Sequence, residues 1–465
     1  MKIYEAAALI KNKSISPSEL ACEIMGRINE REGDIKAYIT LSENLSIPKE
    51  AVEGSPLWGI PIAVKDNICT KGVRTTAGSR MLENFVPDYD ATVVERLKKC
   101  GAVITGKTNM DEFGMGSDSL CSAFHVTKNP HNTLYVPGGS SGGSAAAVKA
   151  GMALASLGTD TGGSIRQPAA FCGIYALKPT YSLISRHGLI AFASSLDCIG
   201  PMANCVKDLA IVTDAIAGGD SKDATSSTRE KENYYANIKP QVKNIKIGLP
   251  KEFFENADDS VKKAVYTMAQ KLEEMGAIVN ECSCKSVKYA TAAYYVISSA
   301  EASSNLARYD GVRFGYKSKE YKSFEELCVK SRSEALGNEV KKRIIFGTRV
   351  LSGENYNFYY NKANLARSLI RNELESLLGE FHVLLTPVCP AVVPKINEKK
   401  DSGKVCEKDR CTAAVSLADL PAISIPCGKD ENGMPIGAQL IGNRFCEQLL
   451  FNIAAACEEG GLCDV

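Results

Sequence analysis

The sequence has almost no excess of charge of one sign. It contains 55 Lys and Arg against 54 Asp and Glu over 465 residues, a net charge of +1. Binding to nucleic acid or to an anionic membrane depends on an excess of positive charge, so the composition favours neither class of protein. No stretch reaches the roughly 20 apolar residues that a membrane-spanning helix needs. The first residues also lack the apolar segment of a secretion signal and the Arg-rich character of a transit peptide.

Histidine is scarce and paired cysteine motifs are absent. There are only four His, and the 17 Cys are scattered without a C-x-x-C pair at zinc spacing. Cys282 and Cys284 form only a C-x-C. An odd number of scattered thiols is typical of a reducing compartment, so we expect a cytoplasmic protein that holds no metal and no cofactor of its own.

Short apolar runs alternate with amphipathic segments along the chain. In the N-terminal region, residues 1–53, Ser16 and Glu19 flank Pro17 in the pattern of a helix start, with Leu20 following on the apolar face. Further strand-like runs are 57–64, 102–104, 154–161, 245–249, 383–386, 422–425 and 438–441. Further helical runs are 144–153, 260–275 and 364–378. This alternation predicts an α/β fold with a mixed or mostly parallel sheet.

The length by itself favours two to three domains. Residues 219–237 are polar and charged, and they predict a surface connection between more regular segments.

Residues 101–108 (GAVITGKT) match the nucleotide-binding pattern G-x-x-x-x-G-K-[ST]. A phosphate-binding loop has to be flexible, with its amides turned toward the anion. The four central residues here are strand formers, so we expect a strand and no phosphate site.

Residues 138–142 (GGSSG) match the G-x-S-x-G motif of serine hydrolases, which would make Ser140 a nucleophile with a downstream His as base. The preceding segment contains Pro137 and makes a poor strand. We keep this interpretation as a minor alternative.

Three segments together indicate acyl transfer: 59–67 (GIPIAVKDN), 137–144 (PGGSSGGS) and 158–166 (GTDTGGSIR). Taken singly, they indicate a solvated lysine, a linker and a helix cap. The glycine-rich runs, however, lie beside apolar strand-like and Ala-rich segments, where flexible linkers seldom lie, and glycine lets the backbone approach a substrate closely.

Acyl transfer needs a nucleophile, a base and an oxyanion site. A serine hydroxyl is inert at neutral pH without a base, and a buried lysine can serve because desolvation disfavours its charged form. We expect the oxyanion donors to be the backbone amides of Thr161, Gly162, Gly163 and Ser164.

With 59–67 (GIPIAVKDN), 106–113 (GKTNMDEF), 136–148 (VPGGSSGGSAAAV) and 158–173 (GTDTGGSIRQPAAFCG), the sequence resembles the amidase signature family. The resemblance implies a Ser–cisSer–Lys triad, with Ser164 as nucleophile, Ser140 as the relay and Lys65 as the base. It also implies one α/β domain over residues 1–465, built on a large mixed sheet with helices on both faces. The signature core would span about 54–205, which replaces the two or three domains that length favours.

Within this family the chain is most similar to the glutamine-hydrolysing A subunits of tRNA-dependent amidotransferases. Segments 111–117, 301–311, 339–344, 347–348 and 351–352 carry this likeness. It implies that ammonia passes to a B subunit, which binds the mischarged Glu-tRNA(Gln) or Asp-tRNA(Asn) and activates it with ATP and Mg. A small C subunit would wrap around the glutamine-hydrolysing one. A stand-alone amidase acting on small carboxamides remains the alternative.

Glutamine presents a carboxylate and an ammonium group, so its binding site needs a fixed cation and a fixed anion. By motif position, Arg343 matches the carboxylate binder and Asp409 the ammonium binder. Tyr295 matches a hydrogen-bond donor in the pocket wall.

Overall fold

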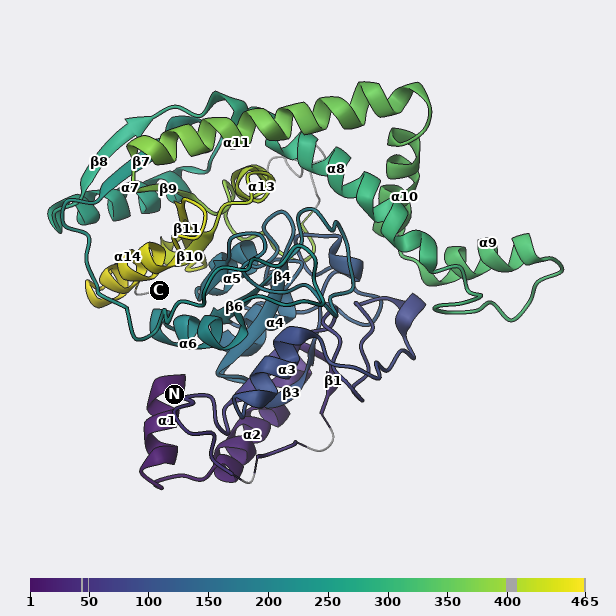
Figure 1. Ribbon diagram of the computed structural model, residues 1–465, viewed down its shortest axis with the longest axis horizontal. Coiled ribbons are helices and arrows are strands. Elements are labelled where there is room, and N and C mark those ends of the chain that lie inside the picture. Colours follow the sequence, from purple (N-terminus) through teal and green to yellow (C-terminus); the bar gives the residue numbers. More distant parts are fainter. Residues whose placement is uncertain (43–44, 49, 399–407, 464–465) are drawn as a thin grey trace.

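The structure, a computed structural model, describes residues 1–42, 45–48, 50–398 and 408–463. Within these ranges, eleven strands form one mixed sheet in the order β1-β3-β2-β4-β6-β5-β10-β11-β9-β7-β8. Helices cover both faces of the sheet: α4 and α6 each contact β4 and β6 from opposite sides (Figure 1). The predicted α/β fold with a large mixed sheet is therefore confirmed.

The strands are β1 Tyr38–Leu41, β2 Pro61–Lys65, β3 Val103–Thr108, β4 Ala155–Asp160, β5 Tyr175–Lys178, β6 Cys198–Ala203, β7 Lys246–Pro250, β8 Ile278–Cys282, β9 Val383–Pro387, β10 Ala422–Lys429 and β11 Pro435–Gly442.

The α-helices are α1 Ile3–Lys11, α2 Pro17–Ile35, α3 Thr92–Lys99, α4 Gly142–Lys149, α5 Arg166–Cys172, α6 Val206–Ile216, α7 Asp259–Glu274, α8 Ala290–Asn305, α9 Phe324–Ala335, α10 Asn338–Val350, α11 Lys362–Glu380, α13 Arg410–Leu417 and α14 Glu447–Glu459. The shorter helical turns are η1 Arg80–Leu82, η2 Glu112–Gly114, η3 Lys251–Phe253, η4 Lys285–Tyr289, η5 Leu306–Arg308 and η6 Tyr356–Asn361.

The parallel strands β3, β2 and β4 place the polar segments that follow them at one edge of the sheet. β2 pairs in parallel with β3 on one side and with β4 on the other. The carboxyl ends of parallel strands meet at the same edge, which is where α/β proteins usually bind ligands. Lys65, Asn109 and Thr161 therefore lie at or just beyond the same edge.

Several predictions of local structure are confirmed. Ser16 caps α2, its hydroxyl accepting a hydrogen bond from the Glu19 amide at 3.2 Å while Glu19 reaches back to the Ser16 amide at 2.7 Å. The other strand-like and helical runs coincide with observed elements, with two shifts. The run from residue 57 becomes a strand only at Pro61, after Gly59 with φ +76°, and the helix expected over 144–153 ends at Lys149, just before Gly151 with φ +72°.

Residues 101–108 form no phosphate loop, because Val103–Thr108 is the fully buried strand β3. The ammonium group of Lys107 is buried and donates hydrogen bonds to the Ile68 carbonyl and, at 2.8 Å, to the Thr75 hydroxyl. The letter match to the nucleotide-binding motif is therefore coincidental, as the strand-forming residues predicted.

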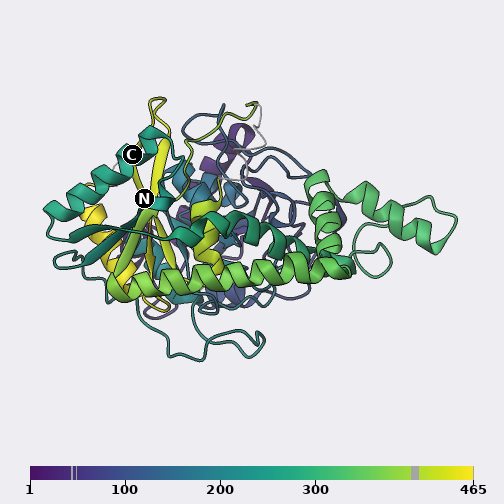
Figure 2. The same cartoon turned by 90° about the horizontal axis from the view of Figure 1, so that it is seen from above.

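Helices α8, η5, α9, α10 and α11 form an arm on one side of the molecule, and α9 projects from the body in both views (Figures 1 and 2). Residues 219–237 contain turns and neither helix nor strand. None of the described helices is long and apolar enough to cross a membrane.

Candidate active site

Lys65 is the last residue of β2 and has no exposed surface. Its Nζ lies 2.8 Å from the hydroxyls of Ser140, Ser141 and Thr159, and 3.3 Å from the Thr159 carbonyl. Sequence reasoning expected Ser140 in this position, while Ser141 and Thr159 were missed, although both lie in or beside the quoted glycine-rich motifs. The fully buried amine is thus surrounded by hydroxyl groups.

Burial lowers the pKa of Lys65 to about 7, because an ammonium ion is costly to desolvate. The nearby carboxylates of Asp111, Asp160 and Asp197 act in the opposite direction and raise it. Burial outweighs these attractions, so a substantial fraction of Lys65 is an uncharged amine near neutral pH.

Hydrogen-bond capacity distinguishes Ser140 from the other partners of Lys65. The Ser141 hydroxyl donates its hydrogen to the Thr159 carbonyl at 3.1 Å, and the Thr159 hydroxyl accepts from Asn67 Nδ2 at 3.1 Å. A neutral amine has two hydrogens and one lone pair. If the hydrogens bond to Ser141 and Thr159, the lone pair faces the hydroxyl of Ser140.

Ser140 follows a cis peptide bond, Gly139–Ser140. The next amide, that of Ser141, donates to the Ser164 carbonyl at 3.1 Å. The loop that carries Ser140 is therefore joined directly to the turn that carries Ser164. Ser164 itself lies just before α5 and is 7% exposed.

The turn 161–164 offers three of its four amides to a ligand. The Gly163 amide donates to Asp160 Oδ1 at 2.8 Å, so it is already engaged. The amides of Thr161, Gly162 and Ser164 donate no hydrogen bond to any described residue. Of the four amides predicted from the sequence to hold the oxyanion, that of Gly163 is therefore engaged by Asp160 in this conformation.

Asp160, whose carboxylate accepts the Gly163 amide, also forms a buried ion pair with Arg166. Arg166 Nε and Nη2 lie 3.0 and 2.9 Å from the two carboxylate oxygens, and neither side chain is exposed. Burial alone would raise the pKa of Asp160, but the Arg166 guanidinium outweighs it and the pKa is lowered. Asp160 therefore stays ionised and fixes the amide of Gly163.

Two side chains missed by sequence reasoning confine the glycine pair of this turn. The Thr412 hydroxyl donates to the Gly162 carbonyl at 2.6 Å, and a Cβ on Gly163 would lie only 2.3 Å from Thr412 Oγ1. A Cβ on Gly162 would lie 2.5 Å from Tyr294 Cζ. Only glycine fits at either position, because both residues are in contact with neighbouring side chains. Sequence analysis predicted only the adjacent Tyr295 as part of the pocket, and nothing else in the sequence indicated Tyr294.

Arg343 lies on α10, with its guanidinium carbon 3.9 Å from the centre of the Tyr295 ring. Its Nε pairs with Glu339 at 2.9 Å and its Nη1 lies 3.5 Å from the Ser298 hydroxyl. Nη2 makes no hydrogen bond with a described residue, which leaves it for a ligand. Tyr295 thus lies beside Arg343, where its ring supports the guanidinium.

Asp409 lies at the N-terminal end of α13, on the same helix as Thr412. Burial raises its pKa to about 6; the positive charge of Arg343 lowers it, and the negative charge of Asp118 adds to the effect of burial. The positive charge of Arg343 thus acts on Asp409, and the glutamine hypothesis requires such a cation and anion in one site.

The alternative base for Ser140, a histidine, has no support among the described contacts. His125 and His131 bond to Asn109 and to the Cys172 carbonyl, and no described His contacts Ser140. In the described ranges, no group of three or more His, Cys, Asp and Glu is arranged to hold a metal ion.

A comparison with known families agrees with this geometry. The family model described as Amidase matches residues 32–451. The chain belongs to the amidase family. This confirms the resemblance drawn from the three glycine-rich and lysine-containing segments.

Relatives of this amidase include two proteins named as the A subunit of glutamyl-tRNA(Gln) amidotransferase. The one from Halothermothrix orenii is 48% identical, covering 99% of this chain and 97% of its own. The one from Sulfurihydrogenibium sp. is 49% identical, covering 97% and 95%.

Two solved structures are similar to this amidase over nearly the whole chain. The A subunit of glutamyl-tRNA(Gln) amidotransferase from Thermotoga maritima has a TM-score of 0.85 at 41% identity, covering 99% of this chain and 94% of its own. The peptide amidase PAM, in complex with chymostatin, has a TM-score of 0.85 at 29% identity, covering 99% and 97%. The fold is therefore shared by tRNA-dependent and other amidases.

Proposed function

We propose that this amidase is the glutaminase subunit of a tRNA-dependent amidotransferase. The observation that carries the chemistry is the buried Lys65 amine within hydrogen-bond distance of Ser140. The proposal that this chain is part of such a complex is supported by its 48% and 49% identity, over almost the full chain, to proteins named as the A subunit of glutamyl-tRNA(Gln) amidotransferase. The other members of the site determine how the reaction would proceed.

The proposed reaction begins with Ser164 as nucleophile. As Ser164 Oγ attacks the carboxamide carbon of glutamine, its proton passes to Ser140, which passes its own proton to the lone pair of Lys65. The lowered pKa of Lys65 leaves the amine able to accept that proton near neutral pH.

The tetrahedral intermediate carries a negative oxygen that needs fixed donors. The amides of Thr161, Gly162 and Ser164 supply them, since the Gly163 amide is held by Asp160. When the C–N bond breaks, the proton held by Lys65 returns through Ser140 and ammonia leaves. Water then attacks the acyl ester of Ser164 and releases glutamate.

In this proposal, substrate selection depends on Arg343 and Asp409. Arg343, through Nη2, binds the α-carboxylate of glutamine, and Asp409 binds the α-ammonium. Tyr295 supports the guanidinium by stacking. Its hydroxyl is the proposed hydrogen-bond donor of the pocket wall. Only a free amino acid has both an α-carboxylate and an α-ammonium group. A site with both Arg343 and Asp409 would therefore bind glutamine in preference to simple carboxamides.

The product ammonia goes to partner subunits. We infer a complex with a B subunit, which binds the mischarged tRNA and activates it with ATP and Mg, and with a small C subunit. This chain would need no cofactor of its own, and the complex would work in the cytoplasm with the translation apparatus. Whether Glu-tRNA(Gln), Asp-tRNA(Asn) or both accept the ammonia depends on the B subunit.

The decisive experiment reconstitutes the complex with Ser164→Ala. We expect loss of glutamine-dependent amidation of tRNA, while ammonium chloride still supports amidation because the acceptor site is intact. The complex with Ser164→Ala should also form no acyl-enzyme detectable by mass spectrometry. If Ser140→Ala abolished acylation while Ser164→Ala retained it, Ser140 would be the nucleophile and the proposal would be wrong.

A stand-alone amidase is tested by Arg343→Ala. We expect the KM for glutamine to rise about 10- to 100-fold, since a charged hydrogen bond contributes about 1.5 to 3 kcal/mol, with little change for a neutral amide substrate. An equal effect on both substrates would favour the stand-alone enzyme.

A further inference from the structure

An open groove of about 820 Å³ lies between two segments: the one from Arg80 to Tyr89, and the one from Asn305 to Lys319 that leads from α8 toward α9. We call it the arm groove. Leu189, Ile190 and Ala191 also line it. None of these residues takes part in the proposed reaction. The volume lies within the range of sites that bind small molecules or short segments of chain.

The arm groove is close to the Lys65 site. The Ile190 amide donates to the Asn67 carbonyl at 2.8 Å, and Asn67 Nδ2 donates to the Thr159 hydroxyl at 3.1 Å. That hydroxyl is a partner of Lys65. On the opposite wall, Asn305 Nδ2 donates to the Phe192 carbonyl at 3.2 Å. A molecule in the groove would therefore lie beside the centre that releases ammonia.

The groove is positively charged although the chain is nearly neutral. Five cations line it: Arg80, Arg308, Arg313, Lys317 and Lys319. Two carboxylates of the lining, Glu83 and Asp88, oppose them, and Arg313 also pairs with Asp310 at 3.8 Å. An excess of two positive charges remains in a chain whose net charge is +1. The side chains of Arg80 and Lys319 make no hydrogen bond or ion pair with any described residue. Such a charge pattern favours an acidic occupant.

Apolar side chains are exposed around the same groove. Val86, Val312 and Phe314 are 52%, 49% and 56% exposed, and Phe324 at the start of α9 is 69% exposed. Of the 20 large apolar side chains that are exposed in the described chain, 11 lie between residues 312 and 369. This concentration on the arm is typical of a surface that binds another protein, because exposed aromatic residues provide most of the binding energy at such interfaces.

We propose that the arm groove binds an acidic segment of the partner subunit that receives the ammonia, with apolar side chains of that segment against Phe314. The inference rests on the proposed function and adds the place and chemistry of the contact. Charge complementarity selects the acidic partner, and exposed Phe314 and Val312 select a protein over a small anion. Docking there would hold the acceptor subunit beside the reaction centre.

The test uses two variants of the full chain. Arg80→Glu combined with Lys319→Glu reverses the two unpaired cations, and Phe314→Ser removes the apolar contact. Matched controls lie on α7, at the opposite end of the molecule from α9 (Figure 1): Lys271→Glu, and Tyr266→Ser, whose ring is 39% exposed. The probe is the purified B and C subunits of the same organism, with Kd measured at low and high salt. Glutamine hydrolysis by each isolated variant is measured in parallel.

We expect each groove variant to raise Kd at least about tenfold, with unchanged glutamine hydrolysis, and both controls to bind like the unmodified chain. Salt should weaken binding of the unmodified chain more than that of the charge-reversed variant.

Unchanged Kd in the groove variants, or a loss of binding confined to the α7 controls, would refute the proposal for the arm groove and leave the proposed function standing. No binding by the unmodified chain, or no glutamine hydrolysis, would refute the proposed function and the groove with it. Binding of bare tRNA or inorganic phosphate that the charge reversal abolishes would show that the groove holds an anion other than a protein.

Discussion

At the residue scale, burial controls the charge of the groups that matter most. Lys65 and Asp409 both have pKa values moved toward neutrality, Lys65 downward to about 7 and Asp409 upward to about 6, because burial disfavours the charged form of each. The base has to be neutral and the ammonium binder has to be ionised. Both requirements are met as the pH rises and lost as it falls.

This sets the pH dependence of glutamine hydrolysis. We expect kcat/KM to fall about tenfold per pH unit below about 7, where Lys65 gains a proton, and more steeply below about 6, where Asp409 is also protonated. In Asp409→Asn the steeper segment should disappear. A rate profile that stays flat between pH 5 and 8 would contradict a lysine base.

Thr412 offers a second test at this scale. Its hydroxyl donates to the Gly162 carbonyl at 2.6 Å and thereby fixes the peptide plane between Gly162 and Gly163. We expect Thr412→Val to lower kcat about 10- to 100-fold with little change in KM, because misplaced oxyanion donors act on the transition state alone. Thr412→Ser, which keeps the hydroxyl, should retain most of the activity. An equal loss of kcat in Thr412→Val and Thr412→Ser would mean that the packing of this side chain, and not its hydroxyl, supports the reaction.

At the element scale, Glu112 in η2 joins three segments of the chain. Its carboxylate accepts a hydrogen bond from the Ser79 hydroxyl next to η1, and another from the Gly337 amide at the start of α10 at 2.8 Å. Since α10 carries Arg343, this contact helps to place the proposed carboxylate binder. Burial raises the pKa of Glu112 to about 7, against the effect of both hydrogen bonds.

A raised carboxyl pKa means that the folded protein holds the proton more tightly than the unfolded chain does. The stabilisation is complete below the ordinary pKa of 4.5 and is lost as the pH rises toward 7. Glu112→Gln cannot ionise, so its free energy of unfolding should increase relative to the unmodified chain between pH 5 and 7.5, by up to about 3 kcal/mol. Urea denaturation at both pH values measures this. Exposed Glu354→Gln is the control. If the free energy of unfolding of Glu112→Gln differed from that of the unmodified chain by the same amount at both pH values, the burial effect would be contradicted.

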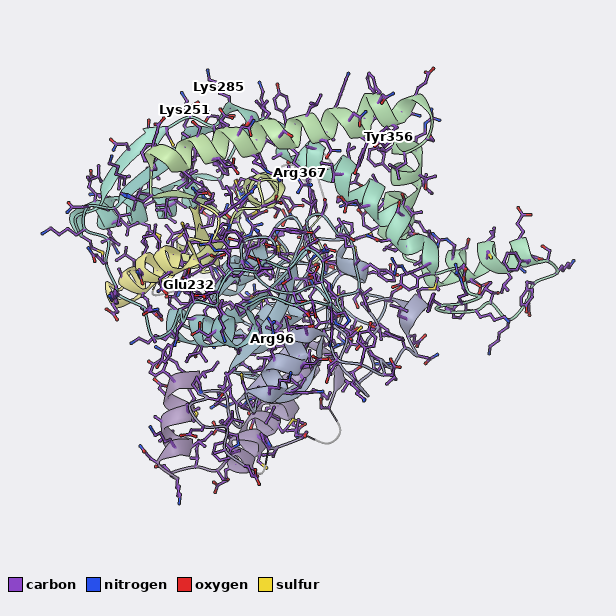
Figure 3. The ribbon with its side chains drawn as sticks, viewed as in Figure 1. Arg96, Glu232, Lys251, Lys285, Tyr356 and Arg367 are labelled. Atoms are coloured by element: carbon purple, nitrogen blue, oxygen red, sulfur yellow. The ribbon has the colours of Figure 1, made fainter. Side chains whose placement is uncertain are left out.

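At the scale of the whole molecule, the two halves of the sheet meet where β5 pairs with β10. Arg367 on α11 reinforces this junction from outside, on the side of the helix that faces the body (Figure 3). It donates to Ser195 Oγ at 3.0 Å, to the Leu417 carbonyl at 3.0 Å and to Asp419 at 3.0 Å. One side chain thus ties the arm to the loop before β6 and to the end of α13.

Loss of this link should destabilise the fold as a unit. We expect Arg367→Leu to lower the free energy of unfolding by about 3 kcal/mol, because several hydrogen bonds to a charged group are lost and Asp419 loses a counter-charge. Thermal denaturation followed by circular dichroism measures the change. Arg349→Leu, on the exposed side of α10, should change it little. A comparable loss in both variants would show that Arg367 has no special role.

Much of this architecture was predictable because it depends on local patterns. The cap at Ser16 and the buried strand around Lys107 follow from side-chain chemistry and apolar runs that need only near neighbours. The site residues Ser140, Ser164 and Lys65 came from motif resemblance, and their roles remain proposals. The single-domain organisation also remains a prediction. Ser141, Thr159 and Thr412 were missed because their roles depend on contacts between segments far apart in the chain.

The sequence by itself determined the α/β class, the membership of the amidase family and the chemical types gathered at the site. Only the tertiary structure decided which groups touch, since the distance between Lys65 and Ser140 depends on the parallel pairing of β2 with β4. It also decided that Asp160 occupies the Gly163 amide and that Lys65 loses its water. Charge state and hydrogen-bond partnership are properties of the surroundings, and the surroundings of a buried group are built from the whole chain.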